Sequence, residues 1–196
     1  FVTPQIRAQA GYTYPNIYGK AFKRTADGQL LLDANGLPQS TAANVNLGEC
    51  APDFTMGFNL HAHYKNLSLS ATMDWQKGGC MYNGTLLTMN YFGTTKESLP
   101  YHEGTMVAEG INEATGAKNT VVVSKQAYYQ AYNDVTEAGI FDTSFLKLRD
   151  VTLSYQFPKL AGINLSVYGF ARNILLWAKM PNLDPESSQG NNNMGG

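Results

Sequence analysis

The chain contains few residue patterns that could do chemistry, and the clearest is the pair His61 and His63. On an extended strand these imidazoles share one face, a spacing that can hold a metal ion. No third ligand follows at a fixed spacing, so we expect no metal site and interpret the pair as part of a polar strand face. Residues 25–38, TADGQLLLDANGLP, carry Asp27 and Asp33 without the acidic series and distal glutamate of a calcium loop. A β-hairpin with a turn at each glycine is the favoured interpretation, calcium is the lesser alternative, and no cofactor is expected.

The sequence also lacks the motifs of common enzyme sites. It contains no Ser-His-Asp order, nucleophile elbow, phosphate-binding loop or dinucleotide-binding motif. The acidic residues of its long central segment are scattered, with no spacing that suggests an acid–base pair: Glu97, Glu103, Glu109, Glu113 and Asp134. We therefore predict no catalytic residues and no enzymatic activity.

The two cysteines of the chain are candidates for a disulfide. With a hairpin turn at residues 65–66, position 50 lies opposite position 81, so Cys80 is one residue away from facing Cys50. A bulge at Gly78 and Gly79 would correct this offset. Since exported proteins can hold disulfides, we predict a bridge between Cys50 and Cys80 across the outer end of the hairpin.

The composition argues against one class of partner and one type of membrane span. Among 196 residues, 14 basic side chains balance 15 acidic ones, which argues against nucleic acid as a partner. Charged residues make up 15%, below the roughly 25% typical of soluble domains. No run of about 18 apolar residues is present, so no transmembrane helix is predicted, although β-barrel strands need only alternate residues to be apolar.

Four stretches alternate between apolar and polar residues over the length of a strand: 53–64, 67–75, 144–157 and 163–177. Lys65 and Asn66 fit a two-residue turn between the first two strands, which brings Tyr64 opposite Leu67. The remaining segments are long and polar, and they fall at the other end of the strands: 1–52, 76–142 and 178–196. Short turns at one end and long loops at the other are typical of an outer-membrane β-barrel with extracellular loops.

Aromatic residues mark both ends of the predicted apolar faces. The short-turn end has Tyr64, Tyr155 and Phe157, and the long-loop end has Phe54, Trp75 and Trp177. A separation of about 9–11 strand residues matches a bilayer with an aromatic girdle at each interface. Alternation alone also fits a soluble β-sandwich in which two apolar faces pack together, so this alternative stays open.

Several sequence blocks resemble one family of outer-membrane proteins. FLKLRDVTLSYQFP, followed by NLSVYGFARNILLWAKMPNLDPE, resembles the C-terminal barrel strands of SusC/RagA-type TonB-dependent transporters, the nutrient importers of Bacteroidetes. Earlier, GECAPDFT and the later DWQKGG resemble a second pair of blocks in that family. The positions that carry the resemblance include residues 145–149, Phe157–Pro158, Arg172–Asn173, Trp177 and residues 184–186.

The resemblance implies an all-β fold, an antiparallel transmembrane β-barrel of about 22 strands. Nothing in the chain matches the family's plug domain or its TonB-contacting segment, and the last strand, which usually ends in an aromatic residue, is not found. Four strands cannot close a barrel without leaving backbone groups unsatisfied in lipid. We therefore expect this chain to be the C-terminal part of a longer transporter in the bacterial outer membrane.

The resemblance also implies a function. Such a barrel imports an oligosaccharide or oligopeptide that a SusD-like surface lipoprotein captures, and energised TonB acts on the plug; the strands contact outer-membrane lipid. Within the predicted loops, aromatic residues are the best ligand candidates because rigid rings stack on sugars and peptide side chains. These are Tyr82, Tyr91, Phe92, Tyr101, Tyr128, Tyr129 and Tyr132. The AYYQAY stretch equally fits a short amphipathic helix that packs a loop. The alternative function is a soluble or surface-attached β-sandwich that binds glycans.

Overall fold

The structure is a computed structural model that describes residues 4–159 and 162–187. The chain forms two compact units. The first, here the sheet unit, consists of residues 52–79 and 142–185. The second, here the loop unit, includes residues 4–51 and 80–141. The long connections of the sequence therefore fold into a unit with its own elements.

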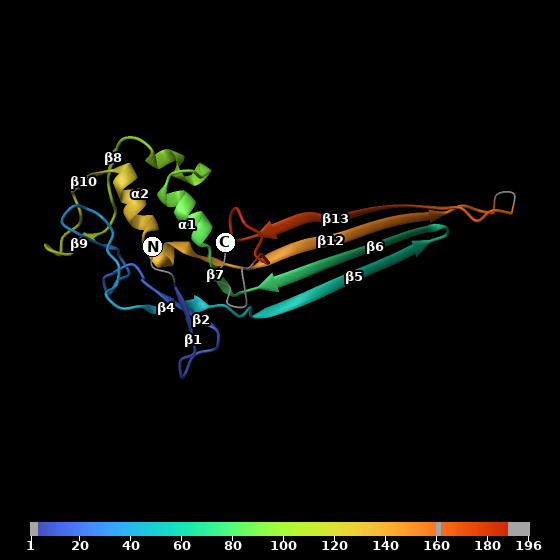
Figure 1. The fold of residues 1–196 in the computed structure, drawn as a ribbon, viewed down its shortest axis with the longest axis horizontal. Helices are drawn as coiled ribbons and strands as arrows, with labels where there is room; N and C mark the ends of the chain where they lie inside the picture. Colours follow the sequence, from blue (N-terminus) through green and yellow to red (C-terminus); the bar gives the residue numbers. More distant parts are fainter. Residues whose placement is uncertain (1–3, 160–161, 188–196) are drawn as a thin grey trace. The chain divides into compact units, whose positions relative to one another are not determined.

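The sheet unit is built on one antiparallel sheet of four strands in the order β13-β12-β6-β5 (Figure 1). Their bounds are Phe54–Tyr64 for β5, Leu67–Lys77 for β6, Phe145–Gln156 for β12 and Ser166–Ala178 for β13. Tyr64 pairs with Leu67 across a turn in which Lys65 has a φ of 54°. The expected hairpin register is therefore confirmed, and β13 begins three residues later than the predicted start at residue 163.

A β-bulge in β12 was not expected from the sequence. The register shifts between Leu148 and Asp150, so Arg149 is an extra residue against β6. Leu148 pairs with Met73 before the bulge, and Val151 pairs with Ala71 after it. One extra residue shifts the alternation of faces by one position. The even-numbered apolar residues before Arg149 therefore lie on the same face as the odd-numbered apolar residues after it. The predicted strand 144–157 therefore keeps a single apolar face over its whole length.

Neither face of this sheet is covered by a second sheet within the described residues. Met56 and Val167, on the apolar face, are 46% and 56% exposed, and Leu69 is half-buried. A β-sandwich would bury these side chains against a facing sheet. The alternative of a soluble sandwich is therefore not supported, and the exposed apolar face instead fits a strand wall in contact with lipid.

The loop unit holds several small sheets. Strands β1 (Gln5–Arg7), β2 (Asn16–Gly19) and β4 (Val45–Glu49) form one antiparallel sheet. Two-stranded sheets join β3 (Leu31–Leu32) to β9 (Ile111–Asn112), β8 (Thr105–Val107) to β10 (Val122–Ser124), and β7 (Cys80–Tyr82) to β11 (Ile140–Asp142). The core of this unit includes the fully buried side chains of Ile17, Leu32, Met81 and Leu87.

Helical segments complete the loop unit: α1 (Gly84–Tyr91), η1 (Lys96–Tyr101), α2 (Lys125–Asn133) and η2 (Thr136–Gly139). The Asn83 side chain caps α1 by accepting from the Leu86 amide at 2.8 Å, and Ser124 caps α2 in the same way. The prediction of irregular loops over 1–52 and 76–142 is corrected by these elements. Strands of two to five residues leave no readable periodicity in a sequence. The elements foreseen in these segments were the hairpin over 25–38 and, as an alternative, the AYYQAY helix.

Candidate functional site

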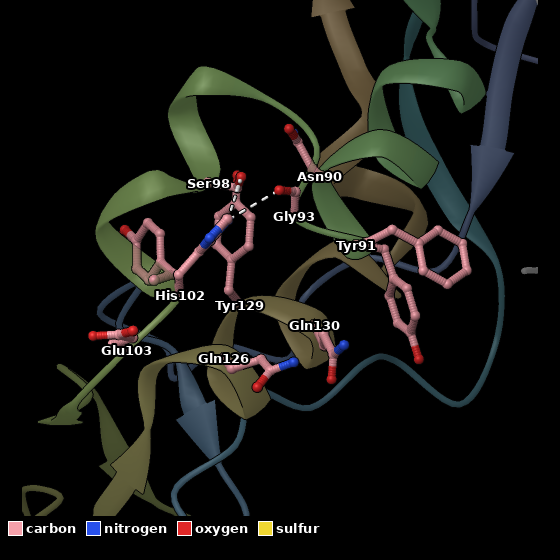
Figure 2. Close-up of a pocket in the computed structure, with 11 residues that line it drawn as sticks. Asn90, Tyr91, Gly93, Ser98, His102, Glu103, Gln126, Tyr129 and Gln130 are labelled. Carbon is pink, nitrogen blue, oxygen red and sulfur yellow. Dashed lines mark hydrogen bonds between the residues drawn. The ribbon is translucent and has the colours of Figure 1, made fainter.

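The loop unit contains a cavity of about 320 Å³ between α1, η1 and α2, here called the α1–α2 pocket (Figure 2). Asn90 and Tyr91 line it from the end of α1, and Phe92 and Gly93 follow in the next link. Further lining comes from η1 and the residues after it, Ser98 and Tyr101 to Glu103, and from Gln126, Tyr129 and Gln130 of α2. This volume lies at the small end of the range of ligand pockets, about 300–1,000 Å³.

Aromatic rings dominate one part of the lining. Tyr101 and Tyr129 stack with ring centroids 4.3 Å apart and an interplanar angle of 12°. Tyr91 and Phe92 meet edge to face at 5.2 Å. Burial raises the pKa of the Tyr129 phenol, so this hydroxyl stays protonated and uncharged at neutral pH. The stack connects η1 to α2 and provides a rigid apolar surface beside polar groups.

The α2 side of the pocket follows from helical spacing. Gln126, Tyr129 and Gln130 stand at positions i, i+3 and i+4, so their side chains share one helix face. Ser124 starts the helix at a defined residue, and Asn133 Nδ2 donates to the Tyr129 carbonyl oxygen at 2.8 Å near its end. Two side-chain amides therefore flank an aromatic ring on the same surface.

His102 is held in place by two polar contacts. Its Nε2 lies 2.9 Å from the Gly93 carbonyl oxygen and 3.2 Å from Ser98 Oγ (Figure 2). A carbonyl oxygen only accepts, so Nε2 carries a hydrogen and Nδ1 is the acceptor of the neutral ring. Gly93 has a φ of 71°, and a Cβ there would lie 3.1 Å from His102 Nε2. Glycine at this position thus permits the close approach of the imidazole.

The electrostatic character of the α1–α2 pocket is neutral to weakly acidic. Among the described residues that line it, Glu103 is the carboxylate and none is Lys or Arg. The other polar groups are the His102 imidazole, the amides of Asn90, Gln126 and Gln130, and the hydroxyl groups of Ser98 and the three tyrosines. Such a lining suits hydrogen bonds to uncharged groups and disfavours an anion.

Four of the seven aromatic residues predicted to bind ligand line this pocket: Tyr91, Phe92, Tyr101 and Tyr129. The other three lie elsewhere. Tyr128 lines a different cavity together with Leu30 and Lys118, and Tyr132 packs its ring 4.5 Å from that of Phe22. Tyr82 is half-buried in the loop unit, where its ring would be 2.9 Å from a Cβ at Gly84 and 2.8 Å from one at Gly139.

Sequence reasoning missed the polar half of the pocket. Asn90, His102 and the two α2 glutamines were not singled out. The spacing of Gln126, Tyr129 and Gln130 was a readable signal, because it puts amides and an aromatic ring on one face of a helix. No local signal links α2 to His102, whose approach depends on the tertiary fold of the loop unit.

Cys50 and Cys80 lie in one buried cluster with Ile17. Both side chains are buried, 2% and 9% exposed. A hydrogen bond from the Cys80 side chain lowers the pKa of the Cys50 thiol, while burial acts in the opposite direction. The two sulfur atoms are thus brought together in the loop unit, and the disulfide between them stays a prediction.

Two of the residues first considered for metal binding, His63 and Asp33, have other partners. His63 Nδ1 lies 2.8 Å from Ser68 Oγ across the β5–β6 hairpin. Asp33 Oδ1 accepts from the amides of Asn35 and Leu37 at 2.8 and 2.9 Å, and Gly28 and Gly36 both lie in turns of the 25–38 segment. Over residues 4–159 and 162–187, no group of three His, Cys, Asp or Glu side chains could hold a metal ion.

The predicted aromatic girdles lie on the four-stranded sheet. Phe54 meets Trp75 edge to face at 4.9 Å, and Trp75 and Trp177 both pair with Leu146 from opposite sides. Near the opposite strand ends, Tyr155 and Phe157 pack edge to face at 4.8 Å, and Tyr64 is strongly exposed. These positions suit two membrane interfaces, and the girdle role stays a prediction.

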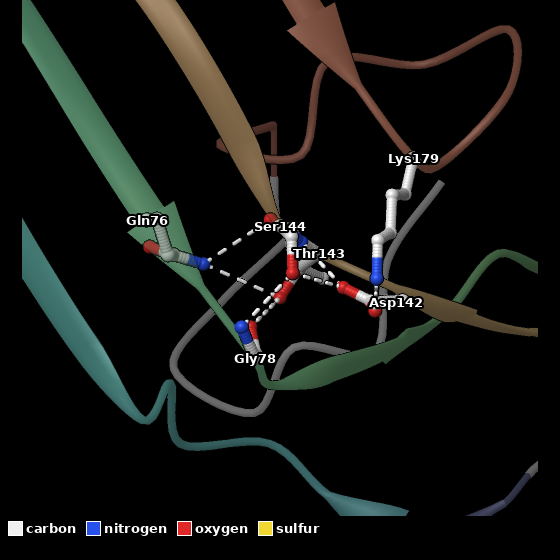
Figure 3. Close-up of polar contacts among 6 residues, drawn as sticks. All are labelled: Gln76, Gly78, Asp142, Thr143, Ser144 and Lys179. Atoms are coloured by element: carbon white, nitrogen blue, oxygen red, sulfur yellow. Dashed lines mark hydrogen bonds and ion pairs between the residues drawn. The ribbon is translucent and has the colours of Figure 1, made fainter.

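Polar contacts connect the end of β6 to the start of β12, and residues 78–79 and 142–144 with Lys179 are here called the polar junction (Figure 3). The Thr143 amide donates to the Gly79 carbonyl oxygen at 3.0 Å, and Thr143 Oγ1 donates to the Gly78 carbonyl oxygen at 3.1 Å. In return, the Gly78 amide donates to Ser144 Oγ at 2.9 Å. Asp142 accepts from the Ser144 amide at 2.8 Å and pairs with Lys179 Nζ at 2.7 Å, which joins the end of β13. These contacts link three strands without help from the apolar face.

The sheet and its two faces define the wall of an antiparallel outer-membrane β-barrel. Of the helices in the described ranges, none has the length and hydrophobicity of a membrane span. A scan against protein-family models finds no match. Two curated proteins of Formosa agariphila are similar over nearly the whole chain: TonB-dependent receptor P3, 27% identical over 201 residues, and TonB-dependent receptor P26, 29% identical over 222 residues.

These alignments cover 93% and 96% of this chain but 19% and 21% of the relatives, so the chain spans about a fifth of their length. Among solved structures, the RagAB peptide importer in the closed-closed state matches with a TM-score of 0.55 and 22% identity, over 92% of this chain and 21% of that one. The similarity to the two receptors supports the resemblance to outer-membrane TonB-dependent transporters that the sequence predicted, and the likeness to RagAB supports the antiparallel barrel fold. None of these proteins is named as an enzyme, in agreement with the prediction of a non-enzymatic role.

Proposed function

We propose that this chain forms part of the wall and of the extracellular loops of an importer that takes up oligosaccharides or oligopeptides. In this proposal a SusD-like surface lipoprotein delivers the substrate, and TonB acts through a part of the transporter outside this chain. The observation that carries the proposal is the division of one sheet into an exposed apolar face and a polar face. Phe58 and Asn59, neighbours at the centre of β5, stand on these two opposite faces.

A pair of arginine substitutions in the full-length protein tests the orientation of the wall. Phe58→Arg places a charge on the face proposed to contact lipid, where it costs about 2–4 kcal/mol at the bilayer midplane. Asn59→Arg places the same charge on the proposed inner face, where water is available. We expect heat-modifiable gel migration of outer-membrane fractions to show a loss of folded protein for Phe58→Arg and near-normal assembly for Asn59→Arg. Equal behaviour of the two variants would contradict this orientation.

Uptake by cells tests the transport role itself. Cells that carry the full-length transporter should accumulate a labelled oligosaccharide or oligopeptide only while TonB is present and the inner membrane is energised. Detergent extracts of their outer membranes should yield a surface lipoprotein that co-purifies with the transporter. Accumulation that continues unchanged without TonB would overturn the proposed import function, and purification without any lipoprotein would overturn the proposed partner.

A further inference from the structure

We propose that the α1–α2 pocket binds one or two rings of an uncharged sugar. This inference rests on the proposed import function, since it assigns a substrate class to a site in the loop unit. It rests on four properties of the pocket: its aromatic surface, its amide groups, its charge and its size.

The aromatic part of the lining offers a platform for the apolar face of a pyranose ring. Phe92 is 66% exposed, so its ring is accessible to a ligand. The Tyr101–Tyr129 stack is already formed, and the two rings hold each other in place. Rigid aromatic surfaces lose little conformational entropy on binding, which favours a weakly polar ligand that stacks.

The polar part of the lining can pair with sugar hydroxyl groups. The amides of Gln126 and Gln130 each offer donors and an acceptor, and a hydroxyl group needs both. Thr95 Oγ1 donates to Asn90 Oδ1 at 2.7 Å. This contact fixes the orientation of the Asn90 amide, with Oδ1 as the acceptor toward Thr95 and Nδ2 as the donor group on the other side. These groups stand beside the aromatic rings, as recognition of a ring with one apolar face and a hydroxylated rim requires.

The charge of the lining selects among sugars. Glu103 would repel the carboxylate of a uronic acid or a sulfate ester, and the described lining residues offer no Lys or Arg to pair with either group. A buried or half-buried anion without a partner is costly, so acidic sugars are disfavoured. The lining therefore indicates an uncharged ring.

Peptides are the other class of substrate, and the pocket suits them less. Peptides commonly bind by adding a strand to a sheet edge or by pairing their terminal charges. The described lining residues come from α1, η1, α2 and the residues that follow α1 and η1, and no strand of the loop unit contributes. The described lining therefore offers a peptide neither a sheet edge nor a Lys or Arg for its terminal carboxylate.

Titration calorimetry on the full-length transporter in detergent tests this inference. The probes are neutral trisaccharides of glucose, galactose, mannose or xylose, a trigalacturonate and trialanine. We expect at least one neutral trisaccharide to bind, and Phe92→Ala and Gln126→Ala each to weaken that binding by about tenfold. Both side chains are exposed, so their removal leaves the fold intact.

Leu99→Ala is the matched control, because Leu99 is an exposed apolar residue of η1 that does not line the pocket. It should bind the neutral trisaccharide as the natural protein does. Binding of no neutral probe, tighter binding of trigalacturonate or trialanine, or an equal affinity in all three variants would each overturn the assignment. TonB-dependent uptake, measured in parallel on the same variants, separates the two proposals. If the natural protein shows no TonB-dependent uptake, the import function is contradicted, whatever the pocket binds.

Discussion

Arg149 Nε lies 2.6 Å from Asp74 Oδ2, and this ion pair stands at the bulge that shifts the register of β12. Arg149 is the extra residue of that bulge, and Asp74 belongs to the neighbouring strand β6. The Arg149 side chain thus stands outside the alternation of the two faces. On both sides of it, β12 keeps its apolar residues on one face.

Deletion of Arg149 should prevent assembly of the barrel wall. Without the extra residue, Leu146 and Leu148 would move to the polar face and Lys147 would move to the apolar face. Arg149→Ala keeps the bulge and removes the partly exposed ion pair with Asp74, which contributes at most about 1 kcal/mol. Heat-modifiable gel migration of the full-length protein should show loss of the folded form for the deletion alone. A deletion variant that assembles as well as Arg149→Ala would show that the bulge is dispensable.

Thiol counting should settle the state of Cys50 and Cys80. Because the chain folds outside the cytoplasm and the two sulfur atoms share a buried cluster, we expect the unreduced, denatured protein to titrate no thiol. Cys50→Ser should then expose one reactive thiol, that of Cys80. Titration of two thiols in the unreduced natural protein would exclude the bridge.

The Asp142–Lys179 pair should make the polar junction sensitive to acid. Burial alone would raise the pKa of Asp142, but hydrogen bonds from Lys179 and Ser144 outweigh it, and the net shift lowers the pKa. A lowered pKa in the folded state stabilises the protein above the unfolded value, about 3.9, and this contribution is lost as the pH falls through the folded value. Asp142 is more than a third exposed, so the effect is at most about 1 kcal/mol.

Hydrogen exchange of the Ser144 amide, which donates to Asp142, can measure this effect in the full-length protein. Protection of this amide should decrease between pH 5 and pH 3 after correction for the intrinsic exchange rate. In Asp142→Asn, protection should be lower at pH 5 and nearly independent of pH. The same pH dependence in the natural protein and the variant would show that another group is responsible.

Alanine at Gly78 should destabilise the end of the β5–β6 hairpin. Gly78 has a φ of 78°, and a Cβ there would lie 2.6 Å from Asp53 Cγ and 2.9 Å from the Asp53 amide nitrogen. Gly28 has a similar φ of 82° with nothing within 4 Å, so Gly28→Ala carries only the backbone cost of about 1–2 kcal/mol. Thermal unfolding of the full-length protein should therefore show a clearly larger loss for Gly78→Ala. Equal losses would mean that Asp53 moves aside without cost.

The sequence predicted the strand positions well because one face of each strand is apolar and the other is polar, which gives the sequence an alternating pattern. Residues 53–64 alternate strictly, and the pairing of Tyr64 with Leu67 followed from a two-residue turn. The bulge at Arg149 was missed, although the change of phase between Leu148 and Val151 is visible in the sequence. Such a change has two explanations, a bulge or a strand end, and local pattern alone does not separate them.

The loop unit was predicted least well. Its strands of two to five residues are too short to show a period, and its folding depends on partners that are distant in the chain. Arg24, for example, pairs with Glu137 through two hydrogen bonds across 113 residues of sequence. Four of the seven aromatic residues predicted as ligand candidates line one cavity, and the sequence did not reveal which four; their role in binding stays a prediction.

The sequence by itself determined the two faces of the strands and the resemblance to TonB-dependent transporters, because hydrophobic alternation and family motifs are local properties of a chain. Only the tertiary structure decided that η1 and α2 stack Tyr101 on Tyr129 beside His102. Those contacts join segments whose separation in sequence carries no pattern, and they form because each segment buries its apolar side chains against the others.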